Sequence, residues 1–130
     1  MESELVYYPV LVKWLESQGW KAKTSVKIDG MECDIYATKK TQRGFRVMEI
    51  EVKVGDFNKV IEQALKRLRI ANYVYIAFTW PNPYLSYVMY KIHENWDTIL
   101  KNGLGLLFVD HETVHIAFKA KYHKINHNVL

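Results

Sequence analysis

The chain has 130 residues, 49% of them hydrophobic, and this size suits one domain with a single core. Eighteen Lys and Arg residues against fourteen Asp and Glu residues give a net charge of +4, which is compatible with a nucleic-acid partner but does not by itself indicate one. No stretch approaches the roughly 18 consecutive apolar residues of a membrane helix, and Glu2 and Glu4 do not fit the basic start of a signal peptide. We therefore expect a soluble, cytoplasmic protein that has no membrane partner.

The single cysteine, Cys33, limits the chemistry that the chain can perform. It excludes an intrachain disulfide and any zinc site built on two or more thiolates. Because Cys33 stands in the alternating run Met31-x-Cys33-x-Ile35, we expect a small buried hydrophobic residue rather than a nucleophile.

Hydrophobic periodicity predicts an α/β chain in which one helix precedes three antiparallel strands. Pro9 indicates that the first helix either kinks or begins near that residue, and Asp29-Gly30 is a strong hairpin turn signal. The later strand, helix and strand have the lengths of a right-handed crossover, so the sheet is expected to be mixed. The predicted elements are a helix over 3–18, strands over 20–28, 31–38 and 46–54, a helix over 57–70, a strand over 73–78, a helix over 84–101 and a closing pair of strands within 105–118.

Two further segments complete this prediction. Residues 1–118 are expected to form the single domain, and 119–130 a basic C-terminal tail.

The helix over 84–101 carries four aromatic residues largely on one side, and we expect these to pack against the sheet or against a partner subunit rather than to stack on bases. They are Tyr84, Tyr87, Tyr90 and Trp96.

The strand over 46–54 carries charged residues where a sheet would ordinarily have hydrophobic ones. Side chains two apart on a strand share a face, so Glu49, Glu51 and Lys53 point away from the apolar set. Hydrolysis of a phosphodiester needs an activated water and neutralisation of charge on the phosphate, and Mg²⁺ takes one or two carboxylates as ligands. Asp34 and Glu51 can supply that pair if their strands are neighbours, with Lys53 beside the metal-bound water.

This pattern resembles the PD-(D/E)XK nuclease superfamily, the fold of many restriction endonucleases and archaeal Holliday-junction resolvases. Its signature is an acid, a gap, and then acid-x-Lys, which here would be Asp34 followed, after sixteen residues, by Glu51-Val52-Lys53. The resemblance covers about residues 4–79, although no proline precedes Asp34. It implies a restriction endonuclease-like fold, a mixed central sheet flanked by helices with an α-β-β-β-α-β core plus a C-terminal helix and strands.

The resemblance also implies roles for individual residues. Asp34, Glu51 and the main-chain carbonyl of Val52 would bind Mg²⁺ or Mn²⁺, and Lys53 would assist the water. Glu4 is the candidate for an additional metal ligand from the first helix, and Gln63 for a catalytic residue on the following one. The residues expected to contact nucleic acid are Arg67, Lys59, Lys66, Lys119 and Lys121.

Simpler interpretations accompany each of these assignments. The three charges could form a solvated strand face, Glu4 could complement a helix dipole, and Lys119 and Lys121 could lie in a solvated tail. The sequence favours a Mg²⁺-dependent endonuclease acting on DNA, with an inactive domain of the same fold that binds nucleic acid or scaffolds a partner as the alternative. It leaves a homodimer, an RNA substrate and a small-molecule substrate open.

Overall fold

The computed structural model describes residues 3–55 and 57–125. Within these residues six strands form one sheet in the order β1-β2-β3-β4-β5-β6. The strands are β1 (Lys21–Ile28), β2 (Met31–Thr41), β3 (Gly44–Lys53), β4 (Tyr73–Thr79), β5 (Gly105–Val109) and β6 (Val114–Phe118). The helices are η1 (Glu4–Tyr7, a 3-10 turn), α1 (Tyr8–Glu16), α2 (Val60–Arg67), α3 (Leu85–Glu94) and α4 (Trp96–Asn102).

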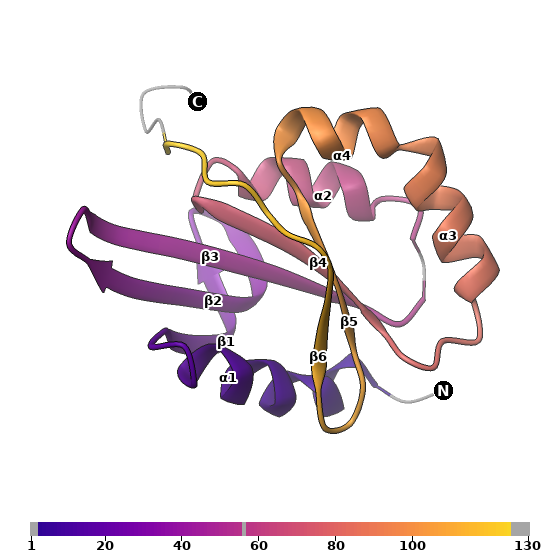
Figure 1. The fold of residues 1–130 in the computed structure, drawn as a ribbon, viewed down its shortest axis with the longest axis horizontal. Helices are drawn as coiled ribbons and strands as arrows, with labels where there is room; N and C mark the ends of the chain where they lie inside the picture. The colour runs from indigo at the N-terminus through magenta and orange to yellow at the C-terminus, as the bar shows by residue number, and fades with distance from the viewer. Residues whose placement is uncertain (1–2, 56, 126–130) are drawn as a thin grey trace.

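Helices cover the two faces of this sheet separately, as Figure 1 shows with α1 on one side and α2 and α4 on the other. On the α1 face, Leu11 and Leu15 pack in one buried cluster with Ile35, Ile50 and other strand residues. On the α2 face, a second cluster joins buried residues of α2, α3 and α4 to the strands, among them Ala64, Val88, Ile99 and Ile76. The core is therefore divided into two layers by the sheet.

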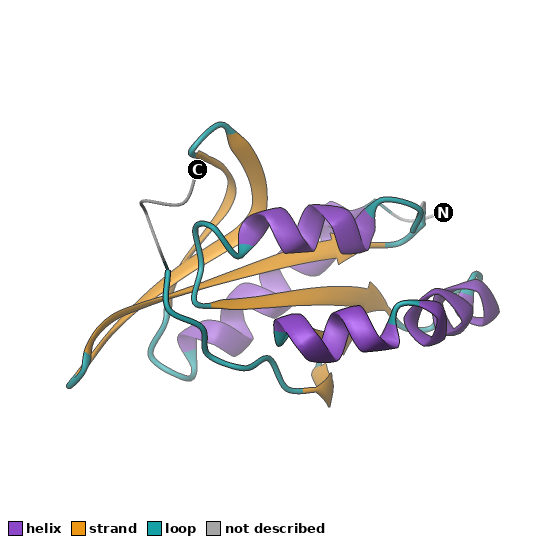
Figure 2. Cartoon of the chain, turned by 90° about the horizontal axis from the view of Figure 1, so that it is seen from above, coloured by secondary structure: helices purple, strands orange, loops and turns teal. Residues whose placement is uncertain are grey.

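The sheet is mixed, as the sequence predicts. β1, β2 and β3 are antiparallel neighbours, whereas β3, β4 and β5 are parallel and β6 returns antiparallel to β5. The turn at Asp29-Gly30 joins β1 to β2 with positive φ at both residues, as an Asp-Gly hairpin requires. Figure 2, which views the molecule from above, shows the long β2–β3 hairpin extending beyond the helices.

Two helices differ from the sequence-based prediction. The expected single helix over 84–101 is two helices, because Asn95 has non-helical dihedrals and its side-chain amide donates to the carbonyl of Lys91 at 2.9 Å. The first α-helix begins at Tyr8, so Pro9 lies in its first turn, where a missing N–H costs nothing. The sequence had left that start open between a kink and a beginning near Pro9.

The aromatic residues of α3 and α4 do not line the sheet as expected. Tyr84, Tyr87 and Tyr90 are exposed, and α3 packs inward through Val88 and Ile92 instead. Trp96 is partly exposed and its ring contacts Phe118 of β6, with ring centroids 5.1 Å apart. The expectation of sheet packing is therefore wrong for the three tyrosines, since their side of α3 faces outward.

The chain from 119 to 125 has no regular secondary structure but is attached to the domain. The N–H of Lys121 donates to the carbonyl of Gly103 at 2.9 Å, and the N–H of His123 donates to the carbonyl of Asn72 at 3.0 Å. Ala120 is buried in the α1-face cluster. Among the described residues, no helix is long and apolar enough to cross a membrane.

Candidate metal centre

The carboxyl groups of Asp34 and Glu51 meet on the α2 face of the sheet. β2 and β3 pair Ile35 with Ile50, so the next step along the ladder sets Asp34 opposite Glu51 with both side chains on one face. Asp34 Oδ2 accepts a hydrogen bond from the main-chain N–H of Val52 at 2.8 Å, and the two carboxyl groups are close enough for the charge of Asp34 to raise the pKa of Glu51. The pairing of the sheet therefore brings together the two acids that the sequence singled out.

A third carboxyl group, that of Glu49, completes an acidic cluster. Glu49 is fully buried on the same face, and neither of its oxygens receives a hydrogen bond from an N–H or hydroxyl donor. The carboxyl group of Glu51, two residues along the same face of β3, interacts with it through its charge. Two buried carboxyl groups side by side cannot both ionise without strong repulsion, so the arrangement favours the protonated form of at least one of them.

Burial and mutual repulsion favour the protonated forms of these acids. Desolvation, followed by the charge of Asp34, raises the pKa of Glu51 to about 7. Desolvation, followed by the charge of Glu51, raises the pKa of Glu49 well above its usual value. A cation bound beside a carboxylate cluster of this kind would stabilise the ionised forms in place of protons.

Arg67 of α2 supplies positive charge to the cluster from inside the protein. Its Nε lies 2.9 Å from Glu51 Oε1, although the two groups are not aligned as a hydrogen bond, so the contact acts through charge. Nη2 donates to the carbonyl of Glu32 at 2.7 Å and Nη1 to that of Gln63 at 3.4 Å. Arg67 thus joins α2 to β2 and β3, and its buried guanidinium is directed into the domain rather than toward a nucleic-acid surface.

Residues of the first helical segment approach the same acids from the other side. Glu4 Oε1 accepts from the N–H of Val54 at 3.4 Å, and partial burial raises the pKa of Glu4 while the nearby Lys53 opposes this. The charge of Asp34 also raises the pKa of Glu4. Lys53 is half-buried at the end of β3, so η1 brings Glu4 near both Lys53 and Asp34.

Tyr8 is a neighbour of Asp34 that sequence reasoning missed. Burial, and then the charge and hydrogen bond of Asp34, raise the pKa of the Tyr8 phenol. With Asp34 it lines a cavity of about 290 Å³, whose wall includes Ser25, Lys27 and Glu32. No signal in the sequence distinguishes Tyr8 from the other apolar residues of the helical stripe, because its role follows from how α1 crosses β2.

The structure does not bring the remaining predicted site residues as close to the acids. Gln63 is half-buried one turn before Arg67, and its side-chain amide makes no hydrogen bond with the described residues. The expected nucleic-acid contacts other than Arg67 are exposed: Lys59, which precedes α2, Lys66, which lies 3.9 Å from Glu62, and Lys119 and Lys121 after β6.

The donor atoms of the acidic cluster suit a divalent metal ion. Asp34 and Glu51 provide adjacent carboxylates, and the unpartnered oxygens of Glu49 lie beside them, which is the oxygen-rich donor chemistry that Mg²⁺ and Mn²⁺ prefer. Over residues 3–55 and 57–125, no three His, Cys, Asp or Glu side chains already converge in a ready-made metal geometry. A divalent cation would therefore use the carboxylate pair, the Val52 carbonyl proposed from the sequence, and water.

Comparison with known proteins extends only to the fold. No family model and no curated protein sequence matches the chain. A solved structure of the SPO1766 protein of unknown function from Silicibacter pomeroyi matches with a TM-score of 0.68 and 16% identity, over 97% of this chain and 77% of that one. SfsA from Pyrococcus furiosus, solved in complex with Ca²⁺, matches with a TM-score of 0.45 and 14% identity, over 88% of this chain and 61% of that one.

Proposed function

We propose that the protein is a metal-dependent phosphodiesterase that hydrolyses nucleic acid, with DNA as its substrate. The proposal includes a restriction endonuclease-like fold of the PD-(D/E)XK type. An antiparallel β1-β2-β3 unit, the α2 crossover to a parallel β4 and a preceding helix on the opposite face support that assignment.

The observation that carries the proposal is the juxtaposition of Asp34 and Glu51. These acids are seventeen positions apart in the sequence, yet strand pairing sets them side by side, on a face that is buried at Glu51 and half-open at Asp34, where the charge of Asp34 raises the pKa of Glu51. Burying carboxylates so close together costs several kcal/mol unless a cation compensates them. A sheet gains no stability from buried acids of this kind, whereas a metal-dependent active site requires them.

Each residue then has a defined role. Asp34, Glu51 and the carbonyl of Val52 would hold the divalent ion, which supplies charge neutralisation at the phosphate and a more acidic bound water. Lys53 places an ammonium group at the end of the same strand, where it stabilises negative charge that develops on the phosphate. Glu4 is near enough to Lys53 and Asp34 for their charges to affect its pKa, and it would act as a further ligand.

One observation favours a second candidate function, an inactive domain that binds nucleic acid without cleaving it. Arg67 already supplies a cation to Glu51 at 2.9 Å, so the cluster is partly compensated in the absence of metal. In this candidate Arg67 takes the place of the metal, and the acids serve to fix α2 on the sheet. The two functions differ in whether added Mg²⁺ produces turnover.

A cleavage assay separates these candidates. Supercoiled, linear, branched and single-stranded DNA would be incubated with Mg²⁺ or Mn²⁺, using the wild type and the variants Asp34→Asn, Glu51→Gln and Lys53→Met. We expect each substitution to lower the cleavage rate by at least about 100-fold, the usual effect of losing an electrostatic group from an active site.

Glu62→Gln is the matched control for this assay, because Glu62 is an exposed acid on α2, and it should leave the rate unchanged. Unfolding curves of all variants exclude loss of structure. Metal-dependent cleavage that survives Glu51→Gln would contradict the proposal. DNA binding without cleavage of any substrate would establish the second candidate instead.

A further inference from the structure

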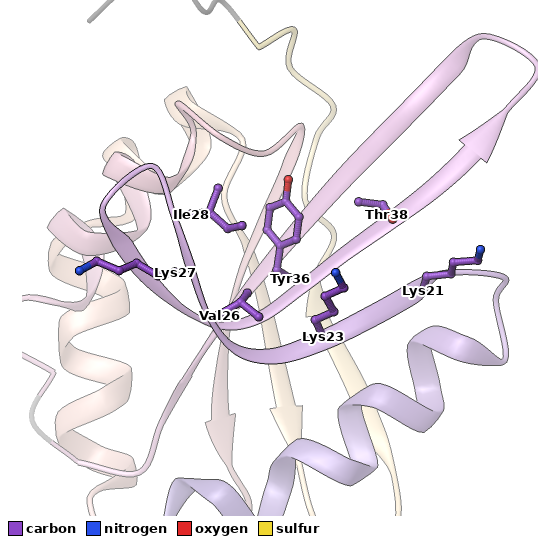
Figure 3. A pocket seen from close by; sticks show the side chains of 7 residues that line it. All are labelled: Lys21, Lys23, Val26, Lys27, Ile28, Tyr36 and Thr38. Atoms are coloured by element: carbon purple, nitrogen blue, oxygen red, sulfur yellow. The ribbon is translucent and has the colours of Figure 1, made fainter.

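A second cavity lies on the β1–β2 hairpin, outside the candidate metal centre. Its volume is about 550 Å³, which is within the range of ligand pockets. The lining combines three lysines with an aromatic ring, two aliphatic side chains and a threonine: Lys21, Lys23, Lys27, Tyr36, Val26, Ile28 and Thr38. Figure 3 shows the ring of Tyr36 standing near the middle of this group, with Ile28 on one side and Lys23 on the other.

The fold leaves this part of the sheet uncovered. Helix α2 packs mainly on β3 and β4, so the α2 face of β1 and β2 remains open. Ser25 has a φ of +52°, a left-handed conformation that interrupts the extended backbone of β1. Figure 3 shows β1 curving over the neighbouring strand, and this curvature turns an otherwise flat edge of the sheet into a concave surface.

The three lysines of the cavity form no ion pair with any carboxylate in the part of the chain that the structure describes. The ion pairs among the described residues involve other cations. Three unpaired ammonium groups attract phosphate. Tyr36 is half-buried, so its ring is held in place while part of it remains accessible. Lysines around a fixed aromatic ring are the elements with which proteins bind unpaired nucleotides.

The register of the sheet connects this cavity to the acids. Lys23 pairs with Tyr36, and Tyr36 pairs with Glu49 on the next strand. Asp34 lies two residues from Tyr36 on β2 and on the same face, a separation of about 7 Å along the strand. The cavity also shares Val26 and Lys27 with the smaller cavity that Asp34 lines. A ligand seated on Tyr36 is therefore adjacent to the candidate metal centre.

We propose that the Lys21–Lys23–Tyr36 cavity binds an unpaired nucleotide of a single-stranded nucleic-acid segment, with the base stacked on Tyr36 and the flanking phosphates held by the lysines. A base inside a duplex has its faces stacked on neighbouring bases, so only an unpaired one can lie on the ring. Binding of the nucleotide does not depend on the proposed function. Only the further step, in which the bound strand continues to Asp34 and Glu51, rests on that function. It indicates a substrate with a single-stranded region next to the scissile bond.

Binding without metal tests the inference separately from catalysis. In EDTA, fluorescence anisotropy would measure the affinity of a labelled oligothymidylate and of a duplex for the wild type, Tyr36→Leu and Lys23→Gln. We expect the single strand to bind more tightly than the duplex, and Tyr36→Leu to weaken it about tenfold, the effect of losing one stacked base. Lys23→Gln should lower both the affinity and its dependence on salt concentration.

The controls keep the result independent of folding. Tyr36→Phe retains the ring and should bind as the wild type does. Lys13→Gln on α1 and Tyr90→Leu on α3 remove an exposed lysine and an exposed tyrosine elsewhere, and should leave the affinity unchanged. Equal binding by Tyr36→Leu and the wild type, or tighter binding of the duplex, would overturn the inference, as would competition by thymidine monophosphate as strong as that of the oligonucleotide. If this binding pattern holds and no substrate is cleaved with Mg²⁺, the nucleotide-binding inference is supported and the proposed catalysis is contradicted.

Discussion

The two faces of strand β3 bury different kinds of side chain. On the α1 face, Met48, Ile50 and Val52 are buried among the apolar residues of α1, β2 and β4. On the α2 face, Glu49 and Glu51 are equally buried, but they meet each other, Asp34 and Arg67. The α1 face stabilises the domain through apolar burial, whereas the α2 face retains acids whose burial costs free energy. The difference indicates that stability accounts for the first face and function for the second.

The largest expected effect comes from the α1 face. Ile50 is fully buried, so Ile50→Ala should lower the free energy of unfolding by about 4 kcal/mol through lost burial and a new cavity. Urea denaturation measures this loss. Cleavage activity per folded molecule should remain within about twofold of the wild type, because Ile50 points away from the acids. A selective loss of activity in a variant that is still folded would show that the two faces are not independent.

Loss of Arg67 from the α2 face should lower the free energy of unfolding by nearly as much. Arg67→Met leaves Glu51 buried beside Asp34 and Glu49 without its cation, and we expect a loss of about 3 kcal/mol by urea denaturation. Replacing both partners, in Arg67→Met with Glu51→Met, should recover most of this loss, since the uncompensated charge is then gone. The neighbouring exposed Lys66→Met is the control and should change stability by less than about 0.5 kcal/mol. A double variant as unstable as the single one would refute the charge argument.

The dependence of stability on pH should distinguish the acids from the apolar face. Because the folded-state pKa of Glu51 is raised from 4.5 to about 7, the folded protein binds a proton that the unfolded chain lacks between these values. The contribution of Glu51 is present in full below about pH 4.5 and is lost as pH rises through about 7. In EDTA, the free energy of unfolding should therefore fall by about 2 to 3 kcal/mol across this window relative to Glu51→Gln. Parallel curves for the two proteins would mean that Glu51 is already ionised.

Much of this arrangement was predictable from sequence alternation. The period of two assigned Glu49, Glu51 and Lys53 to one face and the apolar residues to the other, and the structure confirms this division. Asp29-Gly30 predicted the hairpin that carries Asp34, since few dipeptides adopt the required positive φ so readily. Local backbone chemistry and periodicity suffice for such features because neither depends on distant contacts.

Features that depend on three-dimensional packing could not be predicted in this way. Arg67 was expected at a surface, but the rotation of α2 about its own axis directs it to Glu51 and the carbonyl of Glu32. Glu49 had no assigned role, because its complete burial depends on the elements that pack over this face of β3. Tyr36 and the lysines of β1 appeared as ordinary strand residues, since the cavity requires the curvature of β1.

Direct measurement of metal binding tests the central claim, that the acids of the α2 face form a metal centre. Free Mn²⁺ gives a strong paramagnetic resonance signal that weakens on binding to protein, so titration counts bound ions without any substrate. We predict saturable binding to the wild type and to Ile50→Ala, with at least a tenfold loss of affinity in Asp34→Asn and Glu51→Gln. Saturable binding that is unchanged in both acid variants, or no binding to the wild type, would contradict the claim.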